Sequence, residues 1–470
     1  MAETEFLARY PGYEATARLD ELRATEYAHL DRQGEVYLDY TGAGVYAQAQ
    51  LRAHHQRLES RAFGNPHSAN PASVASTELI DSARRAVLRF LNAPADEYAV
   101  IFTSNASGAC KLVGEAYRFG RGRDLVMTFD NHNSVNGIRE FARRAGSRRR
   151  YVPLAPPELR ITDEAVAAAL RPRRGLFAFP AQSNFTGVQH PLSWVESAHA
   201  AGYDVLLDVA AFLPTNRLDL SRVKPDFVPI SWYKVLGFPT GIGCLVARRE
   251  ALARLRRPWF AGGTIAAVSV GAEWHQLAPD EAAFEDGTLN FLNIPDVEFG
   301  LSWLDTVGRD LIRARVLDLT GWLLDRLTRL RHTNGRPLAR VYGPTGLAGR
   351  GGTVAFNLLD PAGDVVDERL VAKEAAAGGL SLRTGCFCNP GAGEGAFDIG
   401  RRQLRGSSRW NVRTIDDYLE QLGLPSGGAV RVSFGVASTI GDVQRLLDFL
   451  EHTYRDRPAD ATGLDPRLTC

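Results

Sequence analysis

The sequence predicts an α/β protein in which a large domain with a mostly parallel, seven-stranded sheet precedes a smaller C-terminal α+β domain. Seven short apolar runs alternate with helical patterns between residues 98 and 247, and near residue 300 the pattern changes to long helices followed by a few strands. Apolar runs without polar alternation are typical of strands that are buried on both faces. Regular alternation of such strands with helices favours a parallel sheet.

The expected elements follow from length and periodicity. Between two of the strands, residues 107–117 carry apolar side chains at positions 109, 112, 113 and 116, which is a helical spacing. In the C-terminal part we expect long helices over 297–330, strands at 339–342, 353–357 and 429–434, and helices over 365–378 and 441–454. The seven strands of the large sheet are expected at 98–103, 124–129, 150–154, 175–180, 204–208, 226–231 and 243–247.

Four regions follow from this pattern. Residues 1–35 form a helical N-terminal arm, 36–300 the large domain and 301–455 the small domain. Residues 456–470 are polar and contain proline, so we expect a disordered tail.

Composition excludes several classes of protein. The chain has 470 residues, 45% hydrophobic and 23% charged, with a net charge of +1, so nothing indicates nucleic-acid or membrane binding. It contains no run of 18 apolar residues, and its acidic N-terminus lacks a signal-peptide pattern. The spacing of the five cysteines does not resemble a disulfide framework, and we expect a reducing cytoplasm.

Lys234 is the first candidate functional residue. The chain has four lysines, and this one lies where the apolar run 226–233 gives way to a glycine-rich turn. Loops at strand ends are where α/β enzymes place reactive groups. An amine there can form a Schiff base with an aldehyde, which indicates pyridoxal 5'-phosphate. The alternative is a surface lysine beside a turn.

Other residues supply what such a cofactor needs. Asp208 ends an apolar strand and is placed to meet a protonated pyridine nitrogen, although it could also cap the next helix. Residues 102–109 follow a strand, open a helix and can hold a phosphate; the same composition also makes an ordinary capped turn. Ser231 offers a further hydroxyl. His132 lies just past a strand and can stack on a pyridine ring, but lone loop histidines are more often solvated.

Several ordered blocks resemble the class V aminotransferase-like enzymes of fold-type I. They include the runs 37–44, 64–68, 180–188, 226–241, 284–288, 382–391 and 430–435. Among these enzymes the chain is most similar to cysteine desulfurases and to the NifS-like domain of molybdenum cofactor sulfurases. The resemblance covers about residues 35–455. It implies a fold-type I, pyridoxal phosphate-dependent transferase that works as a homodimer.

The resemblance also implies roles for individual residues. Lys234 would carry the cofactor, Asp208 would pair with its ring nitrogen and His132 would stack on the ring. Arg431, helped by Arg383, would clamp the α-carboxylate of the substrate. The remaining contacts to the cofactor would come from Asn184 at the phenolic oxygen, from Asn105, Ala106, Ser107, Ser231 and Tyr233 at the phosphate, and from Thr288 of the neighbouring subunit.

The sulfur chemistry would depend on the loop 383–391, which contains two cysteines. At the position of Cys388 related desulfurases carry the nucleophile, and Cys386 would be a helper or a spectator. A Cys-x-Cys pair can also bind metal or form a redox pair, but no second pair lies nearby in the sequence, so we expect no metal. The turn residues 389–391 are consistent with an exposed loop.

The expected function is a cysteine desulfurase or sulfurtransferase that forms a persulfide on Cys388 and releases alanine. The acceptor would be a protein, the molybdenum cofactor or a biosynthetic small molecule. Eukaryotic sulfurases continue into a second domain, which leaves delivery to the molybdenum cofactor open. Ala211 also departs from the family, which often has Gln or Ser there. The alternatives are a C–S lyase, an epimerase or another class V enzyme, or an inactive scaffold that binds a partner.

Overall fold

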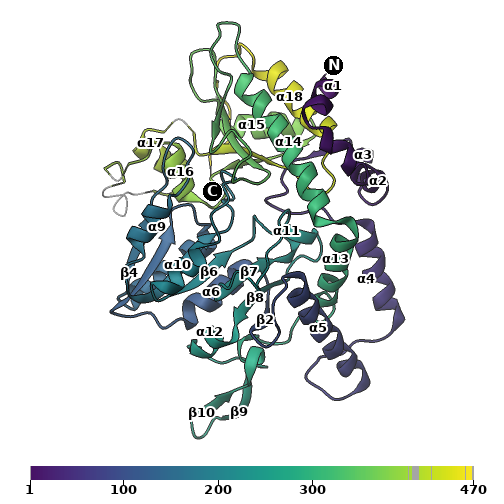
Figure 1. The fold of residues 1–470 in the computed structure, drawn as a ribbon, viewed down its shortest axis with the longest axis vertical. Coiled ribbons are helices and arrows are strands. Elements are labelled where there is room, and N and C mark those ends of the chain that lie inside the picture. The colour runs from purple at the N-terminus through teal and green to yellow at the C-terminus, as the bar shows by residue number, and fades with distance from the viewer. Residues whose placement is uncertain (1, 401, 405–411, 425, 461, 468–470) are drawn as a thin grey trace.

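The computed structural model describes residues 2–400, 402–404, 412–424, 426–460 and 462–467. Its larger sheet has seven strands in the order β2-β8-β7-β6-β5-β3-β4 and lies below the smaller domain in Figure 1. Strand β8 runs antiparallel to both of its neighbours, and the other four strand pairs are parallel. The expectation of a mostly parallel seven-stranded sheet is confirmed. The strands are β2 (Tyr98–Thr103), β3 (Arg123–Thr128), β4 (Arg148–Val152), β5 (Arg174–Pro180), β6 (Tyr203–Asp208), β7 (Phe227–Ser231) and β8 (Gly243–Arg248).

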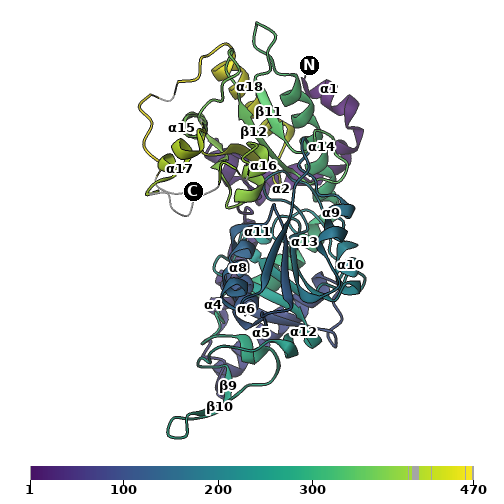
Figure 2. The same ribbon diagram turned by 90° about the vertical axis from the view of Figure 1, so that its left-hand side faces the viewer.

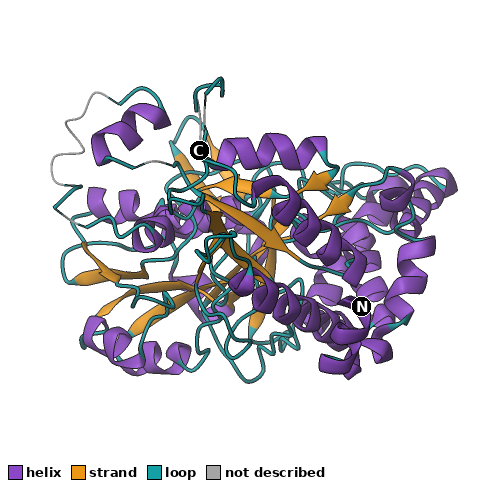
Figure 3. Ribbon diagram, turned by 90° about the horizontal axis from the view of Figure 1, so that it is seen from above, coloured by secondary structure: helices purple, strands orange, loops and turns teal. Residues whose placement is uncertain are grey.

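Helices cover both faces of this sheet, as the view from above in Figure 3 shows. Successive strand residues face opposite helical layers: Leu125 and Met127 pack with one buried cluster, and Val126 packs with the other. This explains why the strands read as continuous apolar runs. One layer contains α6 (Ala106–Ala116), α8 (Ile138–Arg144) and α12 (Arg249–Arg254), and the other contains α5 (Pro71–Phe90), α10 (Trp194–Ala200) and α13 (Ile294–Val307).

Shorter elements fill the connections of the large domain. A hairpin of β9 (Ile265–Ser269) and β10 (Trp274–Leu277) projects from the bottom of the molecule in Figures 1 and 2. Most residues of the hairpin are exposed. The other elements are α4 (Gln48–Ser60), α7 (Asn133–Asn136), α9 (Asp163–Ala169), α11 (Trp232–Leu236) and a 3-10 turn, η2 (Asp280–Phe284).

The smaller domain is built on an antiparallel sheet with the strand order β11-β12-β15-β14. Its strands are β11 (Ala339–Tyr342), β12 (Thr353–Leu358), β14 (Arg383–Gly385) and β15 (Ala429–Ser433). Its helices are α14 (Arg309–Arg329), α15 (Glu368–Ala377), α16 (Pro390–Ala396), α17 (Ile415–Leu422) and α18 (Ile440–Tyr454). Strands and helices therefore occur where the sequence predicts them, and the α+β character of this part is confirmed.

The N-terminal arm lies against the smaller domain. It contains α1 (Ala2–Arg9), a 3-10 turn η1 (Pro11–Thr16), α2 (Arg18–Thr25) and α3 (His29–Arg32). Arg315 of α14 reaches Asp20 at 2.7 Å, and Arg23 reaches Asp442 of α18 at 3.0 Å. Strand β1 (Val36–Tyr37) then pairs with β13 (Leu380–Ser381). The segment that begins the large domain in our division thus also pairs with the small domain, and the domain boundaries remain predictions.

The described part of the tail is held more firmly than its composition indicates. Arg467 forms ion pairs with Asp367 at 2.8 Å, Glu368 at 2.7 Å and Asp416 at 2.6 Å. Its side chain is almost fully buried, so the expectation of disorder fails at this residue. Among the described helices, none has the length and apolar character that a membrane span requires.

Candidate active site

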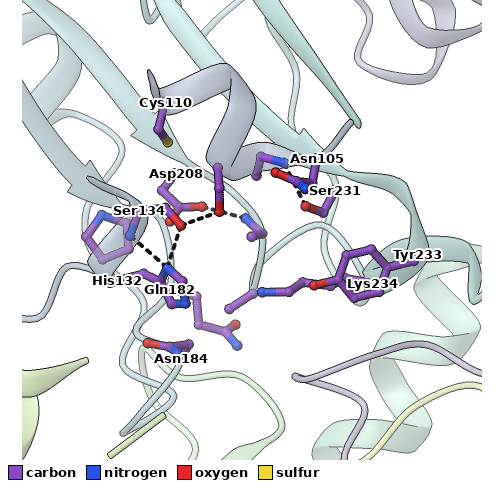
Figure 4. Close-up of a pocket in the computed structure, with 15 residues that line it drawn as sticks. Asn105, Cys110, His132, Ser134, Gln182, Asn184, Asp208, Ser231, Tyr233 and Lys234 are labelled. Carbon is purple, nitrogen blue, oxygen red and sulfur yellow. Dashed lines mark hydrogen bonds between the residues drawn. The ribbon is translucent and has the colours of Figure 1, made fainter. Parts of the chain in front are cut away.

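Most of the predicted site residues meet in one cavity at the carboxyl ends of the parallel strands. Open α/β sheets place their ligand sites at this edge. Figure 4 shows the side chains arranged round the cavity, with Lys234 and Tyr233 on one side and His132 and Asp208 on the other. The predicted residues that line it are Asn105, Ala106, Ser107, His132, Asn184, Asp208, Ser231, Tyr233 and Lys234.

Lys234 lies in α11, the short helix that follows β7 directly. The turn after it is tightly fixed: Gly237 has φ +74°, and a Cβ there would lie 2.3 Å from the backbone nitrogen of Tyr46. A glycine is therefore required at this turn. Burial lowers the pKa of Lys234, and the nearby Asp208 carboxylate only partly opposes this effect. Burial thus favours an uncharged, nucleophilic amine.

Asp208 ends β6 and directs a carboxylate into the cavity. One of its oxygens, Oδ1, accepts the backbone N–H of Ala210 at 2.9 Å, which fixes the side chain. The residue is 9% exposed, so its charge lies in a protein environment beside the cavity. A carboxylate in this position can pair with a cationic ring nitrogen.

His132 is held as a neutral ring with a defined tautomer. Its Nδ1 accepts the backbone N–H of Ser134 at 3.1 Å, so the proton of the neutral ring is on Nε2. Burial, together with the charges of Lys234 and Arg431, lowers the pKa of His132 to about 4, and Asp208 opposes this shift. A neutral imidazole can stack on an aromatic ring and exchange a proton through Nε2.

The other end of the cavity is suited to an anion. Helix α6 begins there, and Asn105 caps it by accepting the N–H of Gly108 at 2.9 Å. The N–H of Ala106 donates to Ser231 Oγ at 2.8 Å. Ser107 Oγ lies 2.5 Å from Ser134 Oγ. Backbone amides at a helix N-terminus, with hydroxyls beside them, form a phosphate-binding arrangement.

A second cavity adjoins the first and contains the residues that the sequence assigns to substrate and sulfur. Arg383, Cys388 and Arg431 line it, together with His132 and Lys234, which also line the first cavity. Cys388 is an exposed free thiol. The thiol, the lysine and the arginines therefore face one continuous space.

The loop that carries Cys388 is attached to the large domain by asparagines. Asn184 Nδ2 donates to the carbonyl of Phe387 at 2.9 Å, and the backbone N–H of Asn133 donates to the carbonyl of Cys388 at 2.7 Å. Asn389 is fully buried, and its Nδ2 donates to the carbonyl of Asp130 at 2.7 Å. Phe387 and Cys388 have φ values of +55° and +52°, an unfavourable conformation for residues other than glycine. Contacts with the large domain therefore hold the loop in this position.

The two arginines form a cluster with an aspartate. Arg383 and Arg431 are directly opposed on the neighbouring strands β14 and β15. Asp39 accepts from both: its Oδ2 lies 2.8 Å from Arg383 Nη2, and its Oδ1 lies 2.7 Å from Arg431 Nη2. Arg431 also stacks on the Phe387 ring, with its Cζ 4.7 Å from the ring centroid.

Sequence reasoning missed several residues of the site. Asp39, Thr41, Ser134 and Gln182 line the cavities or bind their lining residues. Gln182 and Ser134 each follow a predicted strand closely, which is a usable signal; Asp39 follows a two-residue strand that apolar periodicity does not reveal. Thr288 is not among the residues that line the two cavities, and it is exposed on a loop with Asn65.

Comparisons with known proteins show which family the chain resembles. The model of the family described as "Aminotransferase class-V" matches residues 36–446. The molybdenum cofactor sulfurase of Homo sapiens is 35% identical over 459 residues, which cover 93% of this chain and 51% of that protein. The molybdenum cofactor sulfurase of Solanum lycopersicum is 33% identical, with 98% of this chain and 60% of that protein covered. The chain thus spans about half to three-fifths of these relatives.

Solved structures show the same fold. The cysteine desulfurase of Thermococcus onnurineus NA1 in its apo form superposes with a TM-score of 0.77 at 22% identity, over 93% of this chain and 98% of that one. A cysteine desulfurase of Escherichia coli superposes with a TM-score of 0.73, also at 22% identity, over 92% of this chain and 98% of that one. The cystine C–S lyase C-DES, in complex with cysteine persulfide, gives a TM-score of 0.68 at 19% identity, over 90% and 98%.

Proposed function

The chain belongs to the class-V aminotransferase family, and on that premise we propose that it is a pyridoxal phosphate-dependent cysteine desulfurase. It takes sulfur from L-cysteine as a persulfide on Cys388, releases alanine and passes the sulfur to an acceptor. One observation carries this proposal: the free thiol of Cys388 faces the same cavity as the buried amine of Lys234 and the guanidinium of Arg431.

The residues present fit pyridoxal 5'-phosphate. Lys234 would hold its aldehyde, Asp208 its ring nitrogen and His132 its ring face. Asn184 and Tyr233 line the same cavity, and the phosphate would lie at the start of α6, at Asn105, Ala106, Ser107 and Ser231. When it is bound, the cofactor supplies an electron sink that stabilises negative charge at the substrate's α-carbon.

The chain's own residues account for the rest of the chemistry. Arg431 and Arg383 orient the α-carboxylate, and Nζ of Lys234, whose pKa is lowered by burial, accepts the proton of the α-carbon. The thiolate of Cys388 then attacks the substrate sulfur, so that an S–S bond forms and the Cβ–S bond breaks. The electron pair of the broken bond stays on Cβ, which takes the proton of the substrate thiol and becomes a methyl group. Nζ of Lys234 then returns its proton to the α-carbon, which completes alanine. One thiolate and one cysteine thus yield one persulfide anion and one alanine, and no external oxidant is needed.

The site is completed by a second copy of the chain in this proposal. Thr288 is exposed, and large exposed hydrophobic side chains lie on neighbouring parts of the large domain, on α4, α5 and the projecting hairpin. Such surfaces favour a protein interface. These side chains are Leu58 on α4, Val74 on α5, and Val268, Val270 and Trp274 in the hairpin; loops of the large domain add Tyr46, Trp259, Phe260 and Leu292. We infer a symmetric dimer in which Thr288 of each subunit reaches the phosphate in the other.

Mixed dimers test the contribution of Thr288. A Lys234→Ala chain and a Thr288→Ala chain, each inactive alone at limiting cofactor, are mixed and refolded together. If Thr288 acts across the interface, half of the dimers are mixed and each has one intact site, so about a quarter of wild-type activity returns. No recovery would place Thr288 in its own subunit's site, and a Thr288→Ala chain that is active by itself would place it outside the site.

Product analysis tests the reaction itself. With L-cysteine and an excess of a thiol reductant, which reduces the Cys388 persulfide back to the thiol, the wild type should release alanine and sulfide in equal amounts. Cys388→Ala should lose this activity while it keeps the cofactor absorbance, in the range of about 400–430 nm. Pyruvate in place of alanine would make the protein a C–S lyase, the activity named for one structure of the same fold. Borohydride reduction followed by peptide mapping should place the cofactor on Lys234. A protein that stays colourless would contradict the proposal.

The residues of this chain do not identify the molecule that accepts the sulfur. A protein, the molybdenum cofactor or a biosynthetic small molecule could each take sulfur from an exposed Cys388 persulfide. The chain is similar to about half of the human molybdenum cofactor sulfurase, and this likeness makes the molybdenum cofactor one of the proposed acceptors. Transfer from labelled cysteine to each candidate acceptor, in the presence of wild type or Cys388→Ala, distinguishes them.

A further inference from the structure

The two arginines of the second cavity, Arg383 and Arg431, lie so close that their positive charges need a partner in the protein itself. Arg383 and Arg431 are directly opposed across β14 and β15, so their side chains share one face of the sheet. Like charges in that position repel each other. Arg431 is 2% exposed, which makes the repulsion more costly than at a solvated surface. The fold therefore needs an anion between them.

Asp39 is that anion. It contacts both guanidinium groups at 2.7–2.8 Å, and Arg383 binds it through Nε and Nη2. The backbone of Asp39 forms a bridge to Ser433 at the end of β15, which fixes its position in the small domain. Gly42 leaves room for the carboxylate, because a Cβ there would lie 2.3 Å from Asp39 Oδ2. The aspartate is thus built into the site.

The cluster retains capacity for one further anion. Two arginines and one aspartate have a net charge of +1. Arg431 uses Nη1 for the carbonyl of Asn184 and Nη2 for Asp39, while its buried Nε has no hydrogen-bond partner among the described residues. A buried donor without a partner is costly, and a ligand oxygen in the cavity would satisfy it. Arg383 is half exposed and can adjust to the same ligand.

We propose that Asp39 is a positioning and specificity-determining residue, which orients Arg431 and Arg383 and sets the charge of their site at +1. The ligand of this site is the α-carboxylate of an amino acid, and in that respect the assignment rests on the proposed function. A site of this charge favours ligands with one carboxylate over those with two. The sequence contains the aspartate in the run 37–44, but its partners are remote in the chain, so only the fold reveals its role.

Anion binding to cofactor-free protein tests the assignment without any turnover. Acetate and malonate, the second a dianion near neutral pH, are titrated calorimetrically at constant ionic strength. Asp39→Asn keeps the shape but raises the charge of the site to +2, so the preference for malonate over acetate should rise about tenfold. Arg383→Gln lowers the charge to 0 and should shift the preference in the opposite direction. The double variant restores +1 and should return to within about twofold of the wild type.

The controls separate charge from folding. Circular dichroism and thermal unfolding identify a variant that does not fold; if Asp39→Asn is such a variant, the half-exposed Arg383→Gln still tests the charge balance. Unchanged anion preference in either folded single variant would overturn the assignment. With L-cysteine, Asp39→Asn should change KM more than kcat, because it alters ground-state orientation of the carboxylate.

Failure here is distinguishable from failure of the proposed function. If the anion preferences shift as expected but L-cysteine is not converted to alanine, the assignment of Asp39 stands and the desulfurase proposal falls. If L-cysteine is converted normally but the anion preferences are the same in all four proteins, the assignment alone falls.

Discussion

The neutral state of His132 makes the stability of the cofactor-free protein depend on pH in a defined range. Burial lowers the pKa of this residue to about 4 in the folded chain, whereas the unfolded chain has the ordinary value of about 6.5. The unfolded state therefore binds a proton first as the pH falls. The stabilising effect is complete above about pH 6.5 and is lost as the pH falls toward about 4. Linkage gives a loss of about 2 kcal/mol between pH 7 and pH 5, and about 3 kcal/mol in full.

Denaturant unfolding at several pH values measures this effect. The free energy of unfolding of the wild type should fall by about 2 kcal/mol more than that of His132→Gln between pH 7 and pH 5. The nine other histidines are present in both proteins, so their contribution cancels in the comparison. His55→Gln is a matched control, since this side chain is exposed, and it should behave as the wild type. Parallel pH profiles for the wild type and His132→Gln would refute the reasoning.

Two further predictions concern the cysteine loop. Asn389→Ala removes the hydrogen bond to the Asp130 carbonyl and the cap of α16, so it should lower the free energy of unfolding by about 2 kcal/mol. The same variant should speed the alkylation of Cys388 by iodoacetamide. An unchanged alkylation rate would contradict a role of Asn389 in holding the loop. Gly391→Ala would place a Cβ 1.8 Å from the carbonyl oxygen of Phe129 and should lower the free energy of unfolding by about 1–3 kcal/mol. Gly393→Ala in the same helix is the control, because the atom nearest to its new Cβ lies at 3.9 Å, and it should lower stability far less. Equal thermal stability of the two variants would show that the helix shifts freely.

The sequence predicts the large sheet well because most of its strands are apolar runs bounded by turns. Strand β4 is the exception: it begins with three arginines, and the apolar pattern places it at 150–154, two residues after its observed position. The sequence does not predict the direction of β8, which is antiparallel to both of its neighbours. Residues 243–247 are as apolar as those of the parallel strands, and burial on both faces leaves no trace of direction in the side chains. A short connection from β7 through α11 allows the chain to reverse, and Lys234 lies in that reversal.

The site was predictable where a residue's own chemistry identifies it. Lys234, Asp208 and His132 each follow a strand, and parallel strands bring their carboxyl ends together. Asp39 and Arg467 are different, because each acts through partners far away in the chain. Asp39 meets Arg431 across 392 residues, and Arg467 meets Glu368 across 99. Local periodicity contains no information about such pairs, so the sequence alone assigns no role to the polar tail or to the short strand.

In the proposed reaction, the contacts that hold Cys388 at the cavity also restrain the later transfer of sulfur. The loop is attached through the carbonyls of Phe387 and Cys388 and through the side chain of Asn389, which donates to the Asp130 carbonyl and to Asn184 Oδ1. These four hydrogen bonds each contribute about 1 kcal/mol net. Breaking all four costs about 4 kcal/mol, which leaves the open loop in about one molecule in a thousand. Part of that cost is returned, because release relieves the positive φ values of Phe387 and Cys388. The thiol is therefore held where it can attack the substrate, and it remains close enough in free energy to an outward position for an acceptor to capture it.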